Sequence, residues 1–409
     1  MAVPRVSTPG TKHARALARF GSYVGPAFLV AVGYIDPGNW ATDLEAGSRF
    51  GYQLLWVIFV SNLIALIVQS MSARLGLVTG ESYAANCRRH FSGNVWVTFW
   101  IIAEAGLIAT DVAEFMGAML GFQLLFGIGT LLATCLSVLS AFGILALYRY
   151  GDQTVERLFI FMIMLVGLCY LVELKMAPPD WAAVLTSTFW PRLDHSSAAI
   201  AAGIVGATVM PHNLFLHSSL VRRNPDEEKR FALRSTAGDS LIALNASWLI
   251  NAAILITAAT VFFKHGRTVV SIEQAHLTLL PLLGSLAAGA FALGLLVAGI
   301  SSSAAATLAG QVVFEGFWGK GMNLFLRRAL TLIPALIILA MGFDPFRILI
   351  LSQITLSLVL PFALIPLVFL TARPAVMGKY ANGWLSNILA LLATAAVLWF
   401  NGMLLWSVT

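Results

Sequence analysis

Long apolar segments recur along this 409-residue chain and constrain its fold more than any other feature. Charged residues make up only 11% of the chain, whereas soluble domains carry about 25%. A run of about 20 apolar residues can cross a bilayer as a helix. We therefore predict an all-α polytopic membrane protein. Its eleven transmembrane helices are expected at 23–49, 52–78, 96–121, 125–148, 155–176, 197–221, 240–263, 278–314, 325–343, 346–371 and 383–407. The eighth segment is overlong, so we expect either that its ends extend into solvent or that it bends near residues 299–303.

Lysine and arginine residues are divided unevenly between the predicted loops. If residues 1–22 form a cytoplasmic leader, all but six of the 25 basic residues lie on the cytoplasmic side. The exceptions are Arg49, Lys175, Arg192, Lys264, Arg267 and Arg347. Because cytoplasmic loops of membrane proteins are enriched in Lys and Arg, we predict a cytoplasmic N-terminus and an external C-terminus. The positive net charge is then explained by basic residues that face the cytoplasmic membrane surface, and we expect no binding of nucleic acid.

The first apolar segment is interrupted at residues 33–39. Asp36 lies inside it, although a carboxylate near the bilayer centre costs about 2.5–3.5 kcal/mol on insertion scales. Pro37 lacks an amide hydrogen, and Gly38 permits backbone angles that helices do not use. A simple turn between two helices is the alternative, but the flanking pieces are too short to span a membrane separately. We therefore predict a single span with a broken helix.

A second interruption occurs at residues 210–213, near the middle of the sixth apolar segment. Asp-Pro-Gly-Asn and Met-Pro-His-Asn share the form X-Pro-X-Asn. Paired, interrupted hydrophobic segments in corresponding halves are typical of secondary transporters with inverted repeats. We predict a first repeat at 23–176, a second repeat at 197–371, and an additional helix at 383–407.

Together, the two breaks would supply the ligands of a cation site. The first offers the Asp36 carboxylate, the Asn39 amide oxygen and a free carbonyl near Gly33. The second offers the Met210 thioether and a free carbonyl near Ala207. Hard oxygen ligands alone suit calcium or magnesium, whereas a soft thioether favours transition metals such as Mn, Fe, Co or Cd. A methionine in a membrane helix often only packs, so ligation by Met210 is a hypothesis.

Several ionisable residues in apolar segments indicate a proton route. His212 and His217 flank the second break, and a histidine there could bind metal, accept protons or only form hydrogen bonds. Three carboxylates lie along one stripe of the third span, which therefore cannot face lipid. They are Glu104, Asp111 and Glu114. They form either a static ion pair with Arg327 or Arg328, or a proton wire from the metal site to the cytoplasm. Both interpretations can be true, because a chain of carboxylates and arginines can be structural and still conduct protons. The buried amides Asn62, Gln69 and Gln353 either line the pathway or tie helices together.

These residues resemble the Nramp family (natural resistance-associated macrophage proteins) of divalent metal transporters, and in particular its bacterial proton-dependent manganese transporters. The resemblance runs along essentially the whole chain. Its motifs are Asp36-Pro37-Gly38-Asn39, Met210-Pro211-His212, Ala103-Glu104, Thr110-Asp111, Ala113-Glu114-Phe115, Arg327-Arg328 and Gln353. The first motif alone is weak, but it is highly specific when it is paired with the second in an eleven-span frame. Asn213 lies outside the shared motif and receives no role.

The resemblance implies a leucine-transporter-type fold of five plus five inverted-repeat helices, with helices 1 and 6 broken. It implies metal binding by Asp36, Asn39, Met210 and the Ala207 carbonyl, joined in some conformations by the Gly33 carbonyl and Gln353. It also implies proton movement through Asp36, His212, Asp111 and Glu114. The expected protein is a non-enzymatic, proton-coupled importer in a bacterial inner membrane. Its partners are divalent metal ions, protons and lipid, with no cofactor and no obligate protein partner.

Three other functions are weighed against this one. A sodium-coupled amino-acid carrier could use the same fold, but Asp36 would repel a substrate carboxylate at the first break. Relatives that carry magnesium depart from the motif at Met210, which is intact here. An intramembrane metalloenzyme is disfavoured because the chain has no HExxH motif. Cys87, Cys135 and Cys169 lie far apart and support neither a disulfide framework nor a zinc site.

Overall fold

The computed structural model describes residues 25–147, 152–221 and 229–408, and the part described contains helices and no strands. The predicted leader, 1–22, lies outside the described residues. The helices are α2 (Pro26–Gly33), α3 (Pro37–Phe50), α4 (Leu55–Thr79), α5 (Tyr83–His90), α6 (Val95–Phe126), α7 (Thr130–Leu147), α8 (Asp152–Met176), α9 (Trp181–Phe189), α10 (Ala198–Val209), α11 (Pro211–Leu220), α12 (Lys229–Val261), α13 (Ile272–Trp318), α14 (Leu324–Ala340), α15 (Pro345–Ala372), α16 (Pro374–Met377) and α17 (Trp384–Val408). Short 3₁₀ turns lie at His195–Ser197, Phe263–His265 and Gly378–Tyr380.

Nine helical segments in the described ranges are long and apolar enough to cross a membrane. Of the predicted spans, 23–49 is not among them because it is divided into α2 and α3. The second predicted span that is not among them is 325–343, because its helix, α14, has only 17 residues and is too short to be counted. The all-helical membrane architecture is therefore confirmed, whereas the number eleven stays a prediction.

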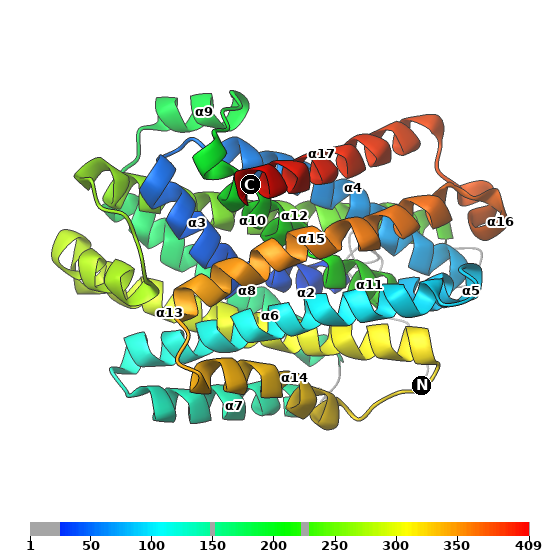
Figure 1. Cartoon of the computed structure of the whole chain (residues 1–409), viewed down its shortest axis with the longest axis horizontal. Helices are drawn as coiled ribbons and strands as arrows, with labels where there is room; N and C mark the ends of the chain where they lie inside the picture. The colour runs from blue at the N-terminus through cyan, green and yellow to red at the C-terminus, as the bar shows by residue number, and fades with distance from the viewer. Residues whose placement is uncertain (1–24, 148–151, 222–228, 409) are drawn as a thin grey trace, which may run out of the picture.

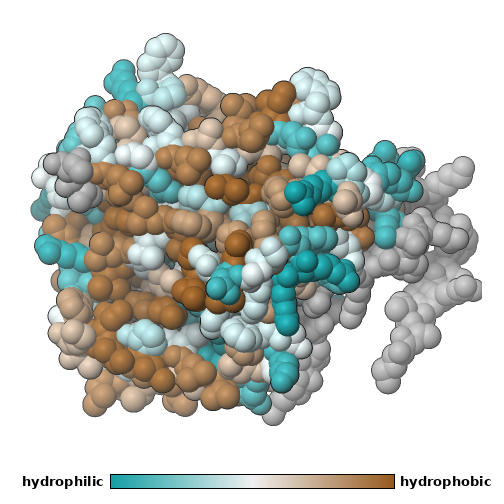
Figure 2. All heavy atoms as spheres, turned by 45° about the vertical axis from the view of Figure 1, so that its right-hand side comes forward, coloured by the Kyte–Doolittle hydropathy of each residue, from teal (hydrophilic) through white to brown (hydrophobic). Residues whose placement is uncertain are grey.

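The outer surface explains why this chain needs a membrane. Large apolar side chains such as Leu131 and Trp384 are 81% and 75% exposed. Figure 2 shows a broad hydrophobic face with hydrophilic groups gathered toward one end. Soluble monomers rarely expose apolar patches larger than about 300–600 Å². The protein is therefore a multi-pass membrane protein whose apolar face meets lipid.

The broken helices α2, α3, α10 and α11 lie in the middle of the bundle, among the longer helices α6, α12, α13 and α15 (Figure 1). Most of their residues are buried: all of α10 except Ala199, and most of α3 and α11. The polar groups that they carry are therefore removed from both water and lipid. Such groups are costly unless they are paired or functional.

The expected bend at residues 299–303 is wrong. The helical backbone of α13 is interrupted at Gly284, where φ is 85° and ψ is 176°. A Cβ atom at Gly299 would come within 2.6–3.1 Å of the backbone of Gly117 and Ala118 in α6. The small residues there allow α13 and α6 to approach closely, and sequence alone does not distinguish such a contact from a bend.

Candidate functional site

At the first break, α2 ends at Gly33 and α3 begins at Pro37. Asp36 caps α3: its Oδ1 atom accepts a hydrogen bond of 2.7 Å from the Asn39 backbone N–H. Proline suits the first position of a helix because its missing N–H would lack an intrahelical partner there anyway. The Asp36 side chain is fully buried. The sequence Asp-Pro-Gly-Asn thus ends one helix, starts another and leaves a carboxylate between them.

At the second break, α10 ends at Val209 and α11 begins at Pro211. Met210 joins them with a φ of 20°, the only positive φ of a non-glycine residue in the described chain. Such backbone strain costs about 1–3 kcal/mol and gathers at functional sites. In both breaks the proline stands four residues after the residue whose carbonyl its N–H would bond in a helix: Pro37 follows Gly33, and Pro211 follows Ala207. Because proline has no N–H, the Gly33 and Ala207 carbonyls lose their usual helical donors.

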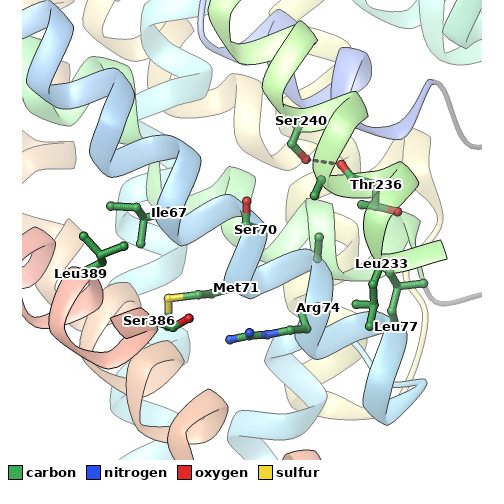
Figure 3. A pocket seen from close by; sticks show the side chains of 12 residues that line it. Ile67, Ser70, Met71, Arg74, Leu77, Leu233, Thr236, Ser240, Ser386 and Leu389 are labelled. Atoms are coloured by element: carbon green, nitrogen blue, oxygen red, sulfur yellow. Dashed lines mark hydrogen bonds between the residues drawn. The ribbon is translucent and has the colours of Figure 1, made fainter. Parts of the chain in front are cut away.

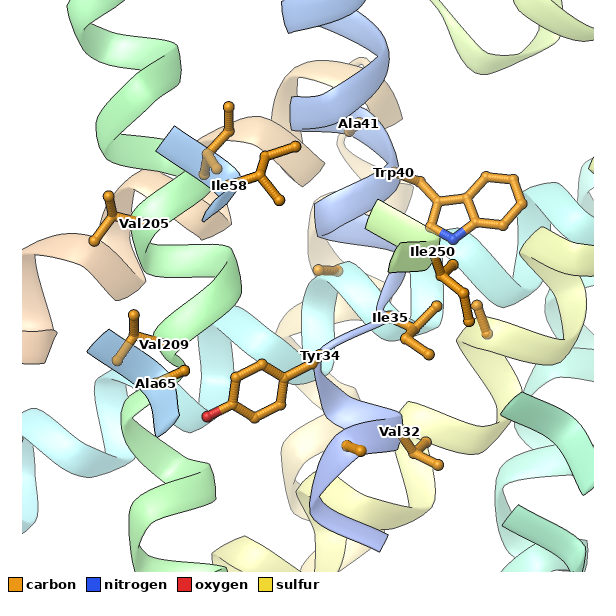
Figure 4. Packing of buried hydrophobic residues seen from close by; sticks show 14 of the residues in the cluster. Val32, Tyr34, Ile35, Trp40, Ala41, Ile58, Ala65, Val205, Val209 and Ile250 are labelled. Carbon is orange, nitrogen blue, oxygen red and sulfur yellow. The ribbon is translucent and has the colours of Figure 1, made fainter. Parts of the chain in front are cut away.

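The two breaks are in direct contact through Asn213. The Asn213 amide nitrogen donates to the Val30 carbonyl at 3.4 Å and lies 3.6 Å from the Met210 sulfur. A Cβ atom added to Gly33 would lie 3.1 Å from the Asn213 amide oxygen. Figure 4 shows the unwound segment at Tyr34 and Ile35 at the level where α10 ends after Val209. The structure therefore brings the two predicted halves of the site together.

Gln353 approaches the first break from α15. Its amide nitrogen donates to the Asp36 Oδ2 atom at 3.2 Å. The Gln353 side chain occupies the space where a Cβ atom of Gly38 would stand, so only glycine fits at that position. On its other side, Gln353 packs its backbone against Gly206 of α10. Gln353 therefore lies between α3 and α10, with its side-chain amide beside the Asp36 carboxylate.

Three amide oxygens around the breaks are buried and accept no hydrogen bond from the described residues: Asn39 Oδ1, Asn213 Oδ1 and Gln353 Oε1. An unpaired buried acceptor costs about 1–3 kcal/mol, and most native structures avoid it. Amide oxygens, backbone carbonyls and a carboxylate are hard ligands for a cation, and the thioether adds a soft one. No group of three or more His, Cys, Asp or Glu residues in the described ranges could hold a metal. A cation at the breaks would therefore be bound by mixed ligands and not by a cluster of three or more such residues.

The predicted carboxylate stripe on α6 forms two ion pairs with α14. Arg327 contacts the Glu104 carboxylate through two hydrogen bonds, of 3.1 and 2.6 Å. Arg328 contacts Asp111 at 2.5 Å and also donates to the Ser303 hydroxyl. The Arg328 and Asp111 side chains are 1% and 2% exposed. The ion-pair interpretation is therefore correct for these two carboxylates, and it leaves the proton route open.

Glu114, the third carboxylate, differs from the other two. It is fully buried, and neither carboxylate oxygen accepts a hydrogen bond of normal geometry from the described residues, although the Ser302 side chain lies near it. It lies within electrostatic range of Asp36, Asp111 and Arg328. Glu114 thus lies between the first break and the ion pairs. Sequence periodicity placed it on the correct face of α6, but could not distinguish it from its paired neighbours.

The two histidines of α11 point to different elements. The His212 Nδ1 atom lies 3.3 Å from the Thr110 hydroxyl, next to Asp111 in the chain. The His217 Nδ1 atom lies 2.9 Å from the Gln69 amide oxygen, and the Gln69 amide nitrogen donates to the Tyr34 hydroxyl at 2.7 Å. His212 therefore contacts α6 at Thr110, whereas His217 contacts the first break through Gln69.

Several polar residues near the site have no role in the sequence-based prediction. The Tyr34 carbonyl accepts hydrogen bonds of 2.8 Å from both Asn39 and Asn251. Asn213 bridges the breaks, and the shared X-Pro-X-Asn form was the signal for it. By contrast, Asn62 donates to Asn245 at 3.1 Å and ties α4 to α12.

Two further carboxylates are buried outside the predicted set, Asp43 in α3 and Glu173 in α8. Asp43 Oδ2 and both Glu173 oxygens accept no hydrogen bond from the described residues. Both residues lie in predicted apolar spans. An acidic residue within such a span could therefore have marked each of them as a candidate site residue from the sequence alone.

Two helix breaks that meet inside a membrane bundle beside a buried carboxylate are typical of membrane transporters. The sequence model described as natural resistance-associated macrophage protein-like matches residues 27–407. The chain therefore belongs to the Nramp family, which consists of membrane transporters and not of enzymes.

Similar proteins agree with this membership. The chain is 44% identical to the divalent metal cation transporter MntH of Caldanaerobacter subterraneus, over 95% of this chain and 94% of that one. It is 43% identical to MntH of Clostridium acetobutylicum, over 97% and 92%. A crystal structure of the Eremococcus coleocola manganese transporter matches with a TM-score of 0.87 at 32% identity, over 97% of this chain and 88% of that one.

More distant structures show the fold alone. Mhp1, a nucleobase-cation-symport-1 family transporter, matches with a TM-score of 0.60 at 17% identity, over 94% of this chain and 92% of that one. MhsT in complex with L-phenylalanine matches with a TM-score of 0.62 at 16% identity, over 94% and 98%. The predicted leucine-transporter-type fold is confirmed.

Proposed function

We propose that this protein imports divalent transition metal ions, Mn²⁺ foremost, together with protons. The substrate would bind at the two breaks, and access would alternate between the two sides of the membrane. The observation that carries the proposal is the contact between the breaks, where the Asp36 carboxylate is buried beside Gln353 and three amide oxygens near the breaks accept no hydrogen bond from the described residues. The names of the similar proteins, divalent metal cation transporter and manganese transporter, support the same substrate class.

The ligands in this proposal are Asp36, Asn39, Met210 and the Ala207 carbonyl, with the Gly33 carbonyl and Gln353 joining in some conformations. Asp36 supplies the charge and the oxygens complete a hard shell. Met210 adds the soft ligand that disfavours Ca²⁺ and Mg²⁺. Fe²⁺, Co²⁺ and Cd²⁺ are further substrates with the same preference.

Protons would move between Asp36 and the cytoplasm. The route we propose uses His212, Glu114, Asp111 and Glu104, with Arg327 and Arg328 at its far end and His217 joined through Gln69. Two contacts support it: His212 lies 3.3 Å from the Thr110 hydroxyl on α6, and Asp111, the next residue of α6, pairs with Arg328. The protein would lie in a bacterial inner membrane, with its N-terminus in the cytoplasm and its C-terminus outside. The inverted repeats would be 23–176 and 197–371, with 383–407 outside both.

Uptake by proteoliposomes tests the function directly. With an acidic exterior, radiolabelled Mn²⁺ should accumulate inside, and the rate should fall when the external pH is raised to the internal value. Amino acids with a sodium gradient, and Mg²⁺, are the comparison substrates. Accumulation of an amino acid without Mn²⁺ would establish the rival carrier, and Mg²⁺ uptake equal to Mn²⁺ uptake would remove the role given to the thioether.

A pair of variants separates a proton route from static ion pairing. Glu114→Gln removes a carboxylate without a hydrogen-bond partner, so we expect the protein to keep its thermal stability and to lose most of the pH dependence of Mn²⁺ uptake. Arg328→Gln leaves the buried Asp111 unpaired, which costs about 3–5 kcal/mol and should lower the melting temperature. The two measurements are uptake against pH and thermal unfolding. If Glu114→Gln keeps the wild-type pH dependence, the carboxylates are structural.

A further inference from the structure

A cavity of about 300 Å³ lies away from the breaks, between α4, α12 and α17. Its size is at the low end of the roughly 300–1,000 Å³ that is usual for ligand pockets. Apolar side chains form most of its wall, among them Ile67, Leu77, Leu233 and Leu389. Figure 3 shows Arg74 of α4 extending across this space toward Ser386 of α17. The cavity thus combines an apolar wall with one cationic group.

All three helices contribute residues near the same end of the bundle. Arg74 lies five residues before the end of α4, while Leu233 and Ser386 lie within the first turns of α12 and α17. This end is rich in cations, because Arg230 and Arg234 are exposed in the first two turns of α12. A cavity at the end of the spans is at the depth where lipid headgroups meet acyl chains.

The cavity opens on the hydrophobic face of the protein. Leu389, in its wall, is 39% exposed, and Leu385 and Ile388 beside it on α17 are 53% and 44% exposed. In a membrane these side chains contact acyl chains. A molecule that enters the cavity therefore comes from the lipid layer.

Arg74 gives the cavity its charge preference. The Arg74 guanidinium donates one hydrogen bond to the Asn382 side chain, and its Nε atom has no hydrogen-bond partner among the described residues. A guanidinium matches the geometry of phosphate oxygens and keeps its charge at any physiological pH. The hydroxyl groups of Ser70, Ser240 and Ser386 provide further polar atoms along the wall.

We propose that this cavity binds one anionic phospholipid, with the phosphate at Arg74 and an acyl chain along the apolar wall. Basic pockets between transmembrane helices on the cytoplasmic side bind acidic headgroups in the same manner. The bound lipid would bridge α4 and α12, which contact the broken helices, to the peripheral α17. The proposal does not depend on which metal the protein carries.

Native mass spectrometry of the detergent-purified full chain tests this binding. Phosphatidylglycerol and phosphatidylcholine with identical acyl chains are added at equal concentrations. We expect wild type to retain phosphatidylglycerol preferentially, and Arg74→Gln to reduce that retention about fivefold, because one basic residue near a membrane surface contributes about that factor. Ser386→Phe, which fills the cavity without changing charge, should reduce retention of both lipids.

Arg89→Gln is the matched control. It removes the same charge at the same end of the bundle from a side chain that is 65% exposed, paired with Glu81 at 2.8 Å and outside the cavity wall. Retention should stay at the wild-type level. Equal retention of the two lipids by wild type, or wild-type retention of phosphatidylglycerol in both cavity variants, would overturn the proposal. Competition by free glycerol phosphate at the same concentration would also overturn it, because the site would then bind a soluble anion.

Discussion

Proteoliposomes that contain Asp36→Asn should take up Mn²⁺ up to about 100-fold more slowly than wild type. Asp36 is the single carboxylate among the proposed ligands, and interactions with a charged group contribute up to about 3 kcal/mol. Asparagine is the informative substitution because it also caps helices, so the hydrogen bond from the Asn39 N–H can be kept while the charge is lost. Asp36→Ala removes both, and the difference between the two variants isolates the contribution of the cap.

Glu45→Gln is the control for this experiment. It removes a carboxylate from the same helix, α3, where Glu45 pairs with Arg49 at 2.5 Å near the surface. Uptake should be unchanged, because exposed ion pairs contribute at most about 1 kcal/mol to stability. Binding of Mn²⁺ by calorimetry gives a second readout that does not depend on conformational cycling. Wild-type Mn²⁺ affinity in Asp36→Asn would rule out this residue as the charged ligand.

Met210→Ala should allow Ca²⁺ to compete with Mn²⁺. In the wild type a soft sulfur occupies one ligand position, whereas Ca²⁺ prefers hard oxygen ligands. Loss of the thioether leaves room for a water oxygen, so the ratio of Ca²⁺ to Mn²⁺ inhibition constants should fall about tenfold or more, since a difference of 1.4 kcal/mol already changes an equilibrium tenfold. The measurement is inhibition of radiolabelled Mn²⁺ uptake by increasing Ca²⁺. Mn²⁺ uptake itself should decrease but persist, because the Asp36 charge is unchanged.

Met119→Ala separates this effect from simple loss of packing. Met119 is 1% exposed in α6, so its truncation creates a comparable cavity and costs about 2–5 kcal/mol of stability. Its Ca²⁺ competition should match wild type. If both methionine variants admit Ca²⁺ equally, a loosened core would explain the result, and Met210 would have no special place in selectivity.

The positions of the helix breaks could be predicted because their causes are local. Pro37 and Pro211 remove backbone donors wherever they stand in a helix, and a carboxylate at residue 36 is costly in any apolar span. The same local reasoning failed at residues 299–303. Small residues such as Gly299 and the nearby serines are expected both where a helix bends and where it packs closely against another helix. Only the contact of Gly299 with α6 in the structure shows that close packing is the reason here.

By itself, the sequence determined that the chain is a helical membrane protein with two interrupted spans and with carboxylates along one face of α6. These features follow from hydropathy, proline chemistry and helical periodicity, each of which acts within about 20 residues. The tertiary structure decided which groups meet. It brought Asn213 between the breaks, Gln353 to Asp36, and Arg328 to Asp111, and it left Glu114 without a hydrogen-bond partner in the described chain. These contacts join residues up to 317 positions apart, and their geometry depends on how whole helices pack.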